Sequence, residues 1–389
     1  MPHVYGLDEA TLKLLAIASD VATNVAAHAA DAVDQEARFP TGTVAALAER
    51  RLLGLCVPTA LGGLGQGPRA FAAVAEELAT ACGSSAMVFV MHVTAAQAIA
   101  SSATLAGRDA LLEEIAAGRH LTTLALSEKG SRSQFWAPVS KLVPDGDAFV
   151  TNAFKSWVTS ANHADSYVAS AQKPGAASPL ESTVYLARKG EHGVHVSGRF
   201  DGLGLRGNDS APVSIEGARI ARADLVSPLG EGAKTMLEVI LPWFAIGTAA
   251  MAHGLGRAAI AATQQHLSGT SFEHTGTALR DLPQLRARLA EMSLKNERSR
   301  ALLGYTLGEI ERPSETTPLY VLQARLSALE TALEVTDLAM KACGGAAFSR
   351  QLGVERLFRD ARAGWVMAPT ADHLLDFVGR ALTGLPLFG

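Results

Sequence analysis

Three cysteines are the side chains whose chemistry depends most directly on their spacing. Cys56, Cys82 and Cys343 are odd in number, lie far apart and form no Cys-x-x-Cys pair. A thiolate zinc site requires closely spaced cysteines, and a disulfide framework normally has an even number of them. We therefore expect no metal site and a chain that works in the reducing cytoplasm.

The charge balance argues against nucleic acid as a partner. The chain carries 34 basic and 38 acidic residues, for a net charge of -4, and has no long run of lysine and arginine. Phosphate backbones are bound by clustered cations. A length of 389 residues with 48% hydrophobic residues is instead typical of a globular protein with two or three domains.

The amino-acid composition changes twice along the chain. Residues 10–119 are rich in alanine and leucine with helical periodicity, and residues 121–229 contain short β-branched and aromatic runs separated by turn residues. Asp145-Gly146-Asp147 predicts a hairpin turn within the second part. Long amphipathic helices are predicted in the third part, at 235–268, 282–311, 318–343 and 370–382.

Two apolar stretches are long enough to need a membrane check. Residues 78–107 contain no charge, but polar residues dilute them, and we expect two buried helices broken near Gly83. Residues 235–256 are interrupted by Glu238 and Pro242, which favours a buried bundle helix. We predict no membrane span, and the acidic residues near the N-terminus argue against a signal peptide.

Five motifs follow one another along nearly the whole chain. They resemble the signatures of the acyl-CoA dehydrogenase superfamily. The resemblance implies an α+β fold with an N-terminal helical domain (1–120), a middle β domain (121–231) and a C-terminal four-helix bundle (232–389). The motifs are Leu53-Gly54-Leu55-Cys56-Val57-Pro58 with Leu61-Gly62-Gly63-Leu64-Gly65, Ala125-Leu126-Ser127-Glu128, Lys155-Ser156-Trp157-Val158-Thr159, Leu203-Gly204-Leu205-Arg206-Gly207-Asn208-Asp209-Ser210, and Gly344-Gly345 with Glu355-Arg356-Leu357-Phe358-Arg359-Asp360-Ala361-Arg362.

The resemblance also implies that the chain binds FAD. Trp157 would lie against the isoalloxazine, Thr159 and the Ser127 region would hydrogen-bond its edge, and Ser133 would approach the pyrophosphate. A flat apolar ring needs an aromatic face, and its polar edge needs short donors. By residue type alone, Trp157 could equally be a core aromatic at a strand end, and Ser127 and Thr159 could be turn residues. The predicted cofactor-binding residues are Leu126, Ser127, Ser133, Trp157, Thr159, Lys341, Gly344, Gly345 and Thr370.

The phosphate contacts depart from the family pattern. Where the family has Pro-Gly-x-Gly-Ser, this chain reads Lys129-Gly130-Ser131-Arg132-Ser133, whose two cations could serve the pyrophosphate or be solvated loop charges. The arginine that in the family reaches the flavin of a neighbouring subunit is missing near Phe272. Lys341 replaces the glutamine before Gly344-Gly345 and could contact phosphate as a point charge.

The catalytic position departs most. Where the family has Tyr-Glu-Gly-Thr, this chain reads Met367-Ala368-Pro369-Thr370, and alanine cannot accept a proton. The first bundle helix, where some relatives place the glutamate, reads Leu241-Pro242-Trp243-Phe244-Ala245. The family signature around Arg359-Asp360 and Arg362 mainly secures bundle and subunit contacts, so we interpret these charges as structural.

Removing an α proton from a thioester requires a positioned base. Asp372 is a weak candidate, since it lies one turn beyond Ala368 but also follows a helix N-cap region that favours an acid. Among the other candidates, His92 fits a satisfied core histidine, Glu238 a helix-surface residue, and His373 a solvent-exposed neighbour of Asp372. The catalytic residue therefore stays unknown.

Three functional interpretations remain open. The first is an FAD-dependent oxidoreductase acting on an acyl thioester of CoA or a carrier protein, with a non-standard base and an unknown electron acceptor. The second is a flavin-dependent monooxygenase of the same superfamily, which needs no such base. The third is a non-catalytic subunit of a mixed oligomer. For each we expect an oligomer, either a tetramer or a dimer, because the long helices are too apolar to face water on every side.

Overall fold

The computed structural model describes residues 3–387, and its helices flank a central region of strands, so the predicted α+β class is confirmed. The N-terminal part is helical, with a π-helical turn at Ala22–Ala26 that joins two of its helices. Its helices are α1 Glu9–Val21, α2 Ala27–Gln35, α3 Thr41–Glu49, α4 Pro68–Ala81, α5 Gly83–Ala100 and α6 Arg108–Ala116.

The middle part contains two sheets. One has the order β1-β4-β5, with β1 parallel to β4, and the other is antiparallel with the order β2-β3-β7-β6. The two sheets share a core that includes Phe149, Tyr167 and Tyr185. The strands are β1 Thr122–Ala125, β2 Leu142–Asp145, β3 Ala148–Val158, β4 Ser166–Gln172, β5 Ser182–Arg188, β6 Val194–Val196 and β7 Ala211–Ala221.

The predicted hairpin is present, but two predicted strands form one. Asp145 pairs with Ala148 across the turn, and Gly146 adopts φ +59°, a left-handed conformation that glycine adopts at no steric cost. Two of the short runs of the second part, at 148–151 and 156–160, are joined by the single strand β3, which ends at Val158 and pairs with β7 with two shifts of register. Of the polar residues between the runs, Asn152 is exposed and Lys155 is completely buried, and both lie on this paired strand and not in a turn.

The C-terminal part is a bundle of long helices. The three longest, α8, α9 and α10, pack on one another, and α12 and α13 pack against α10. Pro242 lies at the start of α8 but inside the continuous helical segment Gly232–Gly269, where it has no amide hydrogen to donate to the preceding turn, and the π-helical turn at Met236–Ile240 directly precedes it. The helices are α7 Gly232–Thr235, α8 Leu241–Gly269, α9 Pro283–Glu311, α10 Thr317–Cys343, α11 Gly345–Phe348, α12 Val354–Val366 and α13 Ala371–Thr383.

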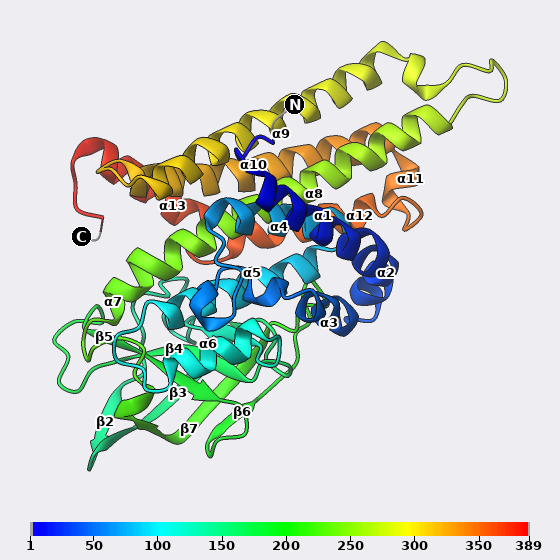
Figure 1. Cartoon of the computed structure of the whole chain (residues 1–389). Coiled ribbons are helices and arrows are strands. Elements are labelled where there is room, and N and C mark those ends of the chain that lie inside the picture. The colour runs from blue at the N-terminus through cyan, green and yellow to red at the C-terminus, as the bar shows by residue number, and fades with distance from the viewer. Residues whose placement is uncertain (1–2, 388–389) are drawn as a thin grey trace.

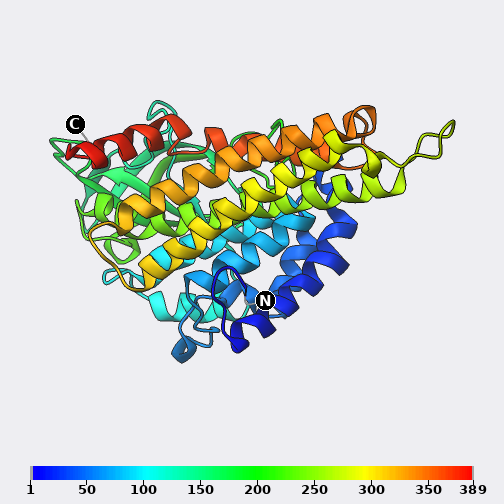
Figure 2. The ribbon, with the colours of Figure 1, turned by 90° about the horizontal axis from the view of Figure 1, so that it is seen from above.

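The three parts form layers (Figure 1). The strands lie at one end, the bundle lies at the other, and α4 and α5 lie between them, because α4 packs on α8 while α5 contacts both α8 and β1. The loop joining α8 to α9 extends beyond the rest of the molecule in both views (Figures 1 and 2). Helices give way to strands after α6, and strands to helices before α7; the exact boundaries at 120 and 231 stay predictions.

The uncharged stretch begins in the last turn of α4 and includes all of α5, and the two helices meet at Cys82 and Gly83 as expected. A side chain at Gly83 would come within 2.9 Å of Asp360 Oδ2, so α5 approaches α12 closely there. By length and composition, three helical segments could cross a membrane: Glu9–Gln35, Gly83–Ala100 and Gly232–Gly269. Of the most apolar window in Gly83–Ala100, 89% is buried inside the protein, against 28% for Glu9–Gln35.

Candidate active site

A cavity of about 670 Å³ lies where the β domain meets α5, α8 and α12. It is large enough for a drug-sized ligand or the ring system of a cofactor. Five predicted cofactor residues line it, and so does Ala368 from the segment after α12. The predicted residues that line it are Leu126, Ser127, Ser133, Trp157 and Thr159.

The Trp157 side chain faces this cavity because of a β-bulge. Between the pairs Lys155–Val213 and Val158–Ala211, β3 carries one more residue than β7, and Trp157 adopts φ +58°. A bulge of this kind changes the direction of a side chain and is frequent beside functional sites. The indole is 69% exposed and meets Phe200 edge-on at 6.4 Å, so it offers an uncovered aromatic face and is not a core residue.

Small hydroxyl groups lie beside this aromatic face. Thr159 Oγ1 is 3.1 Å from Ser210 Oγ, and both residues line the cavity. The carbonyl oxygen of Ser127 accepts a hydrogen bond from the Ser156 amide at 2.8 Å, which holds the loop after β1 against β3. An exposed aromatic face with hydroxyls at its edge fits the flat ring and polar rim of a flavin.

Glu128 fixes the loop that carries Ser127 and Ser133. Its Oε2 accepts from the amides of Val139 and Ser140, at 2.6 and 2.8 Å, and its Oε1 accepts from the Ser140 hydroxyl and from Lys155 Nζ. Burial alone would raise the pKa of Glu128, but the Lys155 ammonium and these hydrogen bonds lower it below the ordinary value. Glu128 is the one carboxylate that lines the cavity within residues 3–387, and its oxygens are occupied.

Cations surround part of the cavity. Arg132, Arg359 and Arg362 line it together with Lys129. Arg359 bonds Asp34 through both terminal nitrogens, at 2.7 and 2.5 Å, which agrees with a structural role. Arg362 instead donates to Thr336 Oγ1 at 2.9 Å and to a backbone carbonyl, so it faces the cavity without a carboxylate partner in the described chain.

Asp360 also has a structural position. It is buried, and its Oδ1 accepts from the Leu205 amide at 2.6 Å, which joins α12 to the loop that precedes β7. Burial raises the pKa of Asp360 to about 6. In the same loop, a side chain at Gly204 would come within 2.4 Å of the Arg359 carbonyl oxygen, so this glycine permits the close approach.

The remaining predicted cofactor residues lie outside this cavity. Lys341 is exposed and pairs with Asp337 at 2.6 Å, and Gly344 and Gly345 are exposed at the end of α10. Thr370 is the N-cap of α13, where its hydroxyl accepts from the His373 amide at 3.4 Å. Within one chain, none of these four residues lines the cavity that contains Trp157. Their contact with a cofactor therefore stays a prediction.

None of the four base candidates lines the cavity. Asp372 lies in the first turn of α13 and is exposed, as the N-cap interpretation expected, and Glu238 is exposed on the π-helical turn. The His373 imidazole is half-buried and packs edge-on against Trp136 at 5.9 Å, so it is less exposed than predicted. His92 lies in the core.

The surroundings of His92 explain its protonation state. Its Nε2 is 3.2 Å from the Leu53 carbonyl, which can only accept, so Nε2 carries a proton. The Thr122 amide donates to Nδ1 at 3.1 Å. Burial lowers the pKa of His92 to about 4, and the histidine stays neutral in the core.

Sequence reasoning missed the apolar end of the cavity. Met87 and Met91 reach it from α5, Ile240 precedes α8, and Phe244 lies in the first turn of α8. The spacing of four between the two methionines places them on one face of the helix, which is the signal that could have identified them. Phe244 gave no such signal, because α8 is apolar on most of its surface.

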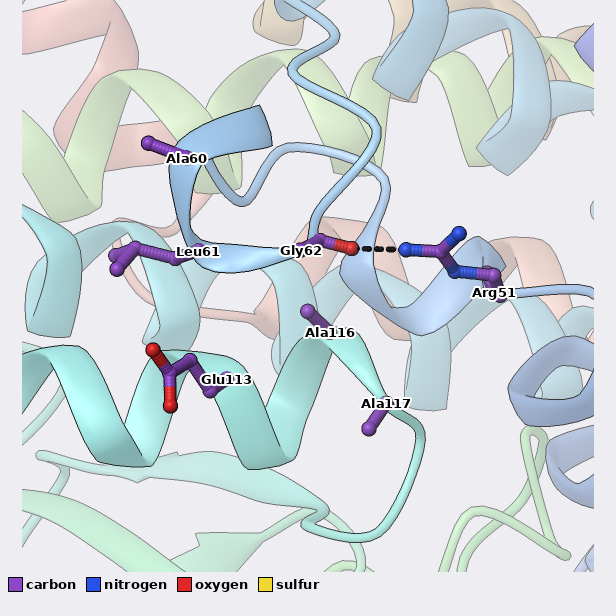
Figure 3. A pocket seen from close by; sticks show the side chains of 7 residues that line it. All are labelled: Arg51, Ala60, Leu61, Gly62, Glu113, Ala116 and Ala117. Atoms are coloured by element: carbon purple, nitrogen blue, oxygen red, sulfur yellow. Dashed lines mark hydrogen bonds between the residues drawn. The ribbon is translucent and has the colours of Figure 1, made fainter.

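A second, more open hollow lies between α6 and the glycine-rich turn (Figure 3). Short side chains line most of it, and Arg51 donates to the carbonyl oxygen of Gly62 across it. Gly62 adopts φ +80° and Gly65 φ +62°, conformations that glycine reaches without steric cost. Without an aromatic side chain, this hollow is a poorer candidate than the cavity at Trp157.

Comparisons with known proteins agree with this architecture. Models of the acyl-CoA dehydrogenase N-terminal, middle and C-terminal domains match residues 8–119, 123–218 and 230–383. The probable acyl-CoA dehydrogenase YngJ of Bacillus subtilis (strain 168) is 27% identical over 350 residues, covering 88% of this chain and 90% of the relative. The cyclohex-1-ene-1-carbonyl-CoA dehydrogenase of Geobacter metallireducens is 25% identical over 383 residues, covering 98% and 99%.

A solved structure supports the same fold. Butyryl-CoA dehydrogenase from Megasphaera elsdenii superimposes with a TM-score of 0.92 at 21% identity and covers 97% of this chain and 99% of its own. The three domain models together span nearly all of the chain, in the order that the motifs predicted. The chain therefore belongs to the acyl-CoA dehydrogenase family of FAD-dependent oxidoreductases that act on acyl thioesters.

Proposed function

We propose that this chain binds FAD in the cavity at Trp157 and acts as an oxidoreductase on an acyl thioester there. The observation that carries the proposal is the meeting of three parts in one cavity: the exposed Trp157 indole, the hydroxyls of Thr159 and Ser210, and the apolar end formed by α5 and α8. When bound, FAD supplies the hydride acceptor. The family membership supports the same cofactor and reaction class.

The two ends of the cavity have different roles in this proposal. Trp157 and Thr159 bind and orient the flavin ring. Met87, Met91 and Phe244 hold an apolar acyl chain and exclude water from it. In this proposal the cavity contacts only the acyl end of the thioester. CoA thioesters and carrier-protein thioesters differ in the part that lies outside the cavity, so the cavity does not distinguish between them.

The flavin phosphates have candidate partners in the loop after β1. Arg132 and Ser133 line the cavity and adopt φ +49° and +65°, which turns the loop sharply at this point. We propose that they contact the pyrophosphate, with Lys129 as a nearby charge. Lys341, Gly344, Gly345 and Thr370 would then contact the FAD of a neighbouring subunit in a homo-oligomer, most simply a tetramer.

The proposed reaction lacks the family's usual base. Ala368 lines the cavity at the position of the catalytic glutamate, and Glu128, the carboxylate that lines this cavity in the described chain, is ion-paired to Lys155. The cavity lining of the described chain thus offers no free carboxylate, and a proton acceptor would come from the substrate, from solvent, from another subunit or from a residue such as Asp372 that lies outside the lining. We expect unactivated straight-chain thioesters to react slowly for this reason.

The absorption spectrum of the purified full-length protein tests the proposal. A flavin spectrum, or its appearance after FAD is added to the colourless protein, together with binding of an acyl-CoA, supports it. A colourless protein that does not bind added FAD would overturn it and favour a non-catalytic subunit. Transfer of an oxygen atom from O2 to a product in the presence of externally reduced flavin, without thioester oxidation, would instead identify a monooxygenase. The cytoplasmic location and the absence of a membrane span stay predictions.

A further inference from the structure

Arg325 on α10 is completely buried and has no carboxylate partner among residues 3–387. Its Nη2 donates to the carbonyl oxygen of Met367 at 3.1 Å, while Nε and Nη1 have no hydrogen-bond partner. Burial lowers its pKa to about 9, so the guanidinium stays charged at neutral pH. A buried charge is normally paired, because leaving it unpaired costs several kcal/mol. The Phe244 ring offers Arg325 a cation–π contact, but the described chain supplies no carboxylate and leaves two of its nitrogens without a hydrogen bond.

The guanidinium lies directly behind the apolar end of the cavity. Its central carbon is 4.8 Å from the centre of the Phe244 ring, and Nη2 contacts the backbone of Met367. Phe244 and Met367 both line the cavity. These two residues come from the two segments in which the family places a catalytic carboxylate, and neither segment carries a carboxylate in this chain.

We propose that Arg325 is the counter-ion of a carboxylate at the far end of the acyl group, so that the preferred substrate is a monothioester of a dicarboxylic acid. This inference rests on the proposed thioester function and names its substrate class. The free donors of a guanidinium match carboxylate oxygens, and hydrogen bonds between two charged groups are the strong ones. A neutral acyl chain would leave Arg325 unpaired, which gives a large discrimination between the two substrate types.

One movement is required for this contact. Arg325 has no exposed surface in the structure, so a side chain between it and the cavity must shift when the carboxylate enters. Met367 is half-buried, unbranched and flexible, and rotation of its side chain is the movement we propose. Its backbone carbonyl, which holds Arg325 in place, need not move.

Binding of two matched thioesters tests the inference. Glutaryl-CoA and pentanoyl-CoA have the same number of acyl carbons, and they differ by a terminal carboxylate in place of a methyl group. Isothermal titration of the full-length, FAD-bound protein should show glutaryl-CoA binding about 10-fold to 100-fold more tightly. Arg325→Met should remove this preference, and Arg325→Lys should retain part of it. Arg298→Met, which removes an exposed arginine from α9, is the matched control and should leave it unchanged.

Equal affinities of the unmodified protein for the two thioesters would overturn the inference, and this result requires no variant that could fail to fold. A preference for glutaryl-CoA that survives in Arg325→Met would exclude Arg325 as the counter-ion. If neither thioester binds, the proposed function fails as well. Equal binding, in contrast, leaves the proposed function intact.

Discussion

The Lys155 ammonium nitrogen lies 2.5 Å from Glu128 Oε1, and their side chains are 0% and 3% exposed. This single ion pair joins the loop that carries Ser127 and Ser133 to the strand that carries Trp157 and Thr159. Lys155 Nζ also donates to the Ser170 carbonyl oxygen on β4, so the pair connects both sheets of the β domain. The position of the proposed flavin site thus depends on two charged residues that do not themselves need to touch the cofactor.

Lys155→Met should destabilise the protein strongly. It leaves the Glu128 carboxylate buried without a counter-charge, a change that typically costs about 3 to 5 kcal/mol. Urea unfolding would measure the loss. Lys13→Met removes a lysine from an exposed ion pair with Glu9 and should change little. Equal stability of Lys155→Met and the unmodified protein would mean that this pair does not hold the two motifs together.

Trp157→Ala should weaken FAD retention or shift the flavin spectrum without a large loss of stability. The indole is exposed to the cavity, so its removal takes away a stacking face and little core packing. Tryptophan and alanine both have a Cβ, so the steric cost of φ +58° at position 157 is similar in the unmodified protein and in the variant. Tyr305→Ala, at an exposed aromatic on α9 outside the cavity, is the control for the flavin titration. An unchanged spectrum and affinity would place the flavin elsewhere.

Ala368→Glu should increase the rate at which a straight-chain acyl-CoA bleaches the flavin. A positioned general base contributes about 100-fold to 10,000-fold, and Ala368, where the motif comparison predicts the catalytic glutamate, lines the cavity. The assay is anaerobic mixing with butyryl-CoA or octanoyl-CoA, and the rate for the unmodified protein should be low. Rapid bleaching by the unmodified protein would reveal a base, and Asp372→Asn would then ask whether Asp372 supplies it.

His92 should make the protein less stable as the pH falls. Its pKa is about 4 in the folded state and about 6.5 when unfolded. The stability that follows from the neutral imidazole is therefore present above pH 6.5 and is lost as the pH falls toward 4. Between pH 7 and pH 5 this amounts to about 2 kcal/mol.

Urea unfolding at the two pH values should show a smaller difference for His92→Asn than for the unmodified protein. His28→Asn, at an exposed histidine on α2, should retain the full difference. If the pH dependence of His92→Asn matches that of the unmodified protein, another group controls acid stability. The buried His253, whose pKa burial also lowers to about 4, would then be the next residue to replace.

The protein should form a homo-oligomer in solution, most simply a tetramer. Large apolar side chains such as Phe348 and Val366 are 84% and 68% exposed on one chain, and assembly would cover surface of this kind. Light scattering should give a mass that is a multiple of 40.6 kDa. A stable monomer at micromolar concentration would contradict this and would also remove the proposed role of Lys341, Gly344 and Gly345.

The sequence predicted the fold class and much of the site. Motif order placed Ser127, Trp157, Thr159 and Ala368 in one functional region, and these residues line one cavity. Each motif alone is too short to identify the family. The prediction of the fold depends on finding the five motifs in the correct order along the chain. The sequence also shows that position 368 carries no carboxylate, and the assignment of this position to the family's catalytic glutamate stays a prediction.

The tertiary structure decided what local patterns could not. No periodicity reveals that a bulge between Lys155 and Val158 exposes Trp157, because a bulge depends on how β3 pairs with β7. The sequence kept Asp372 as a weak candidate base and favoured a core position for His92, but only packing shows that Asp372 is exposed and that His92 lies between two backbone groups. Arg325 lies in an amphipathic helix whose pattern does not distinguish a buried arginine from an exposed one. Burial and pairing are properties of contacts between distant segments, so only the folded chain determines them.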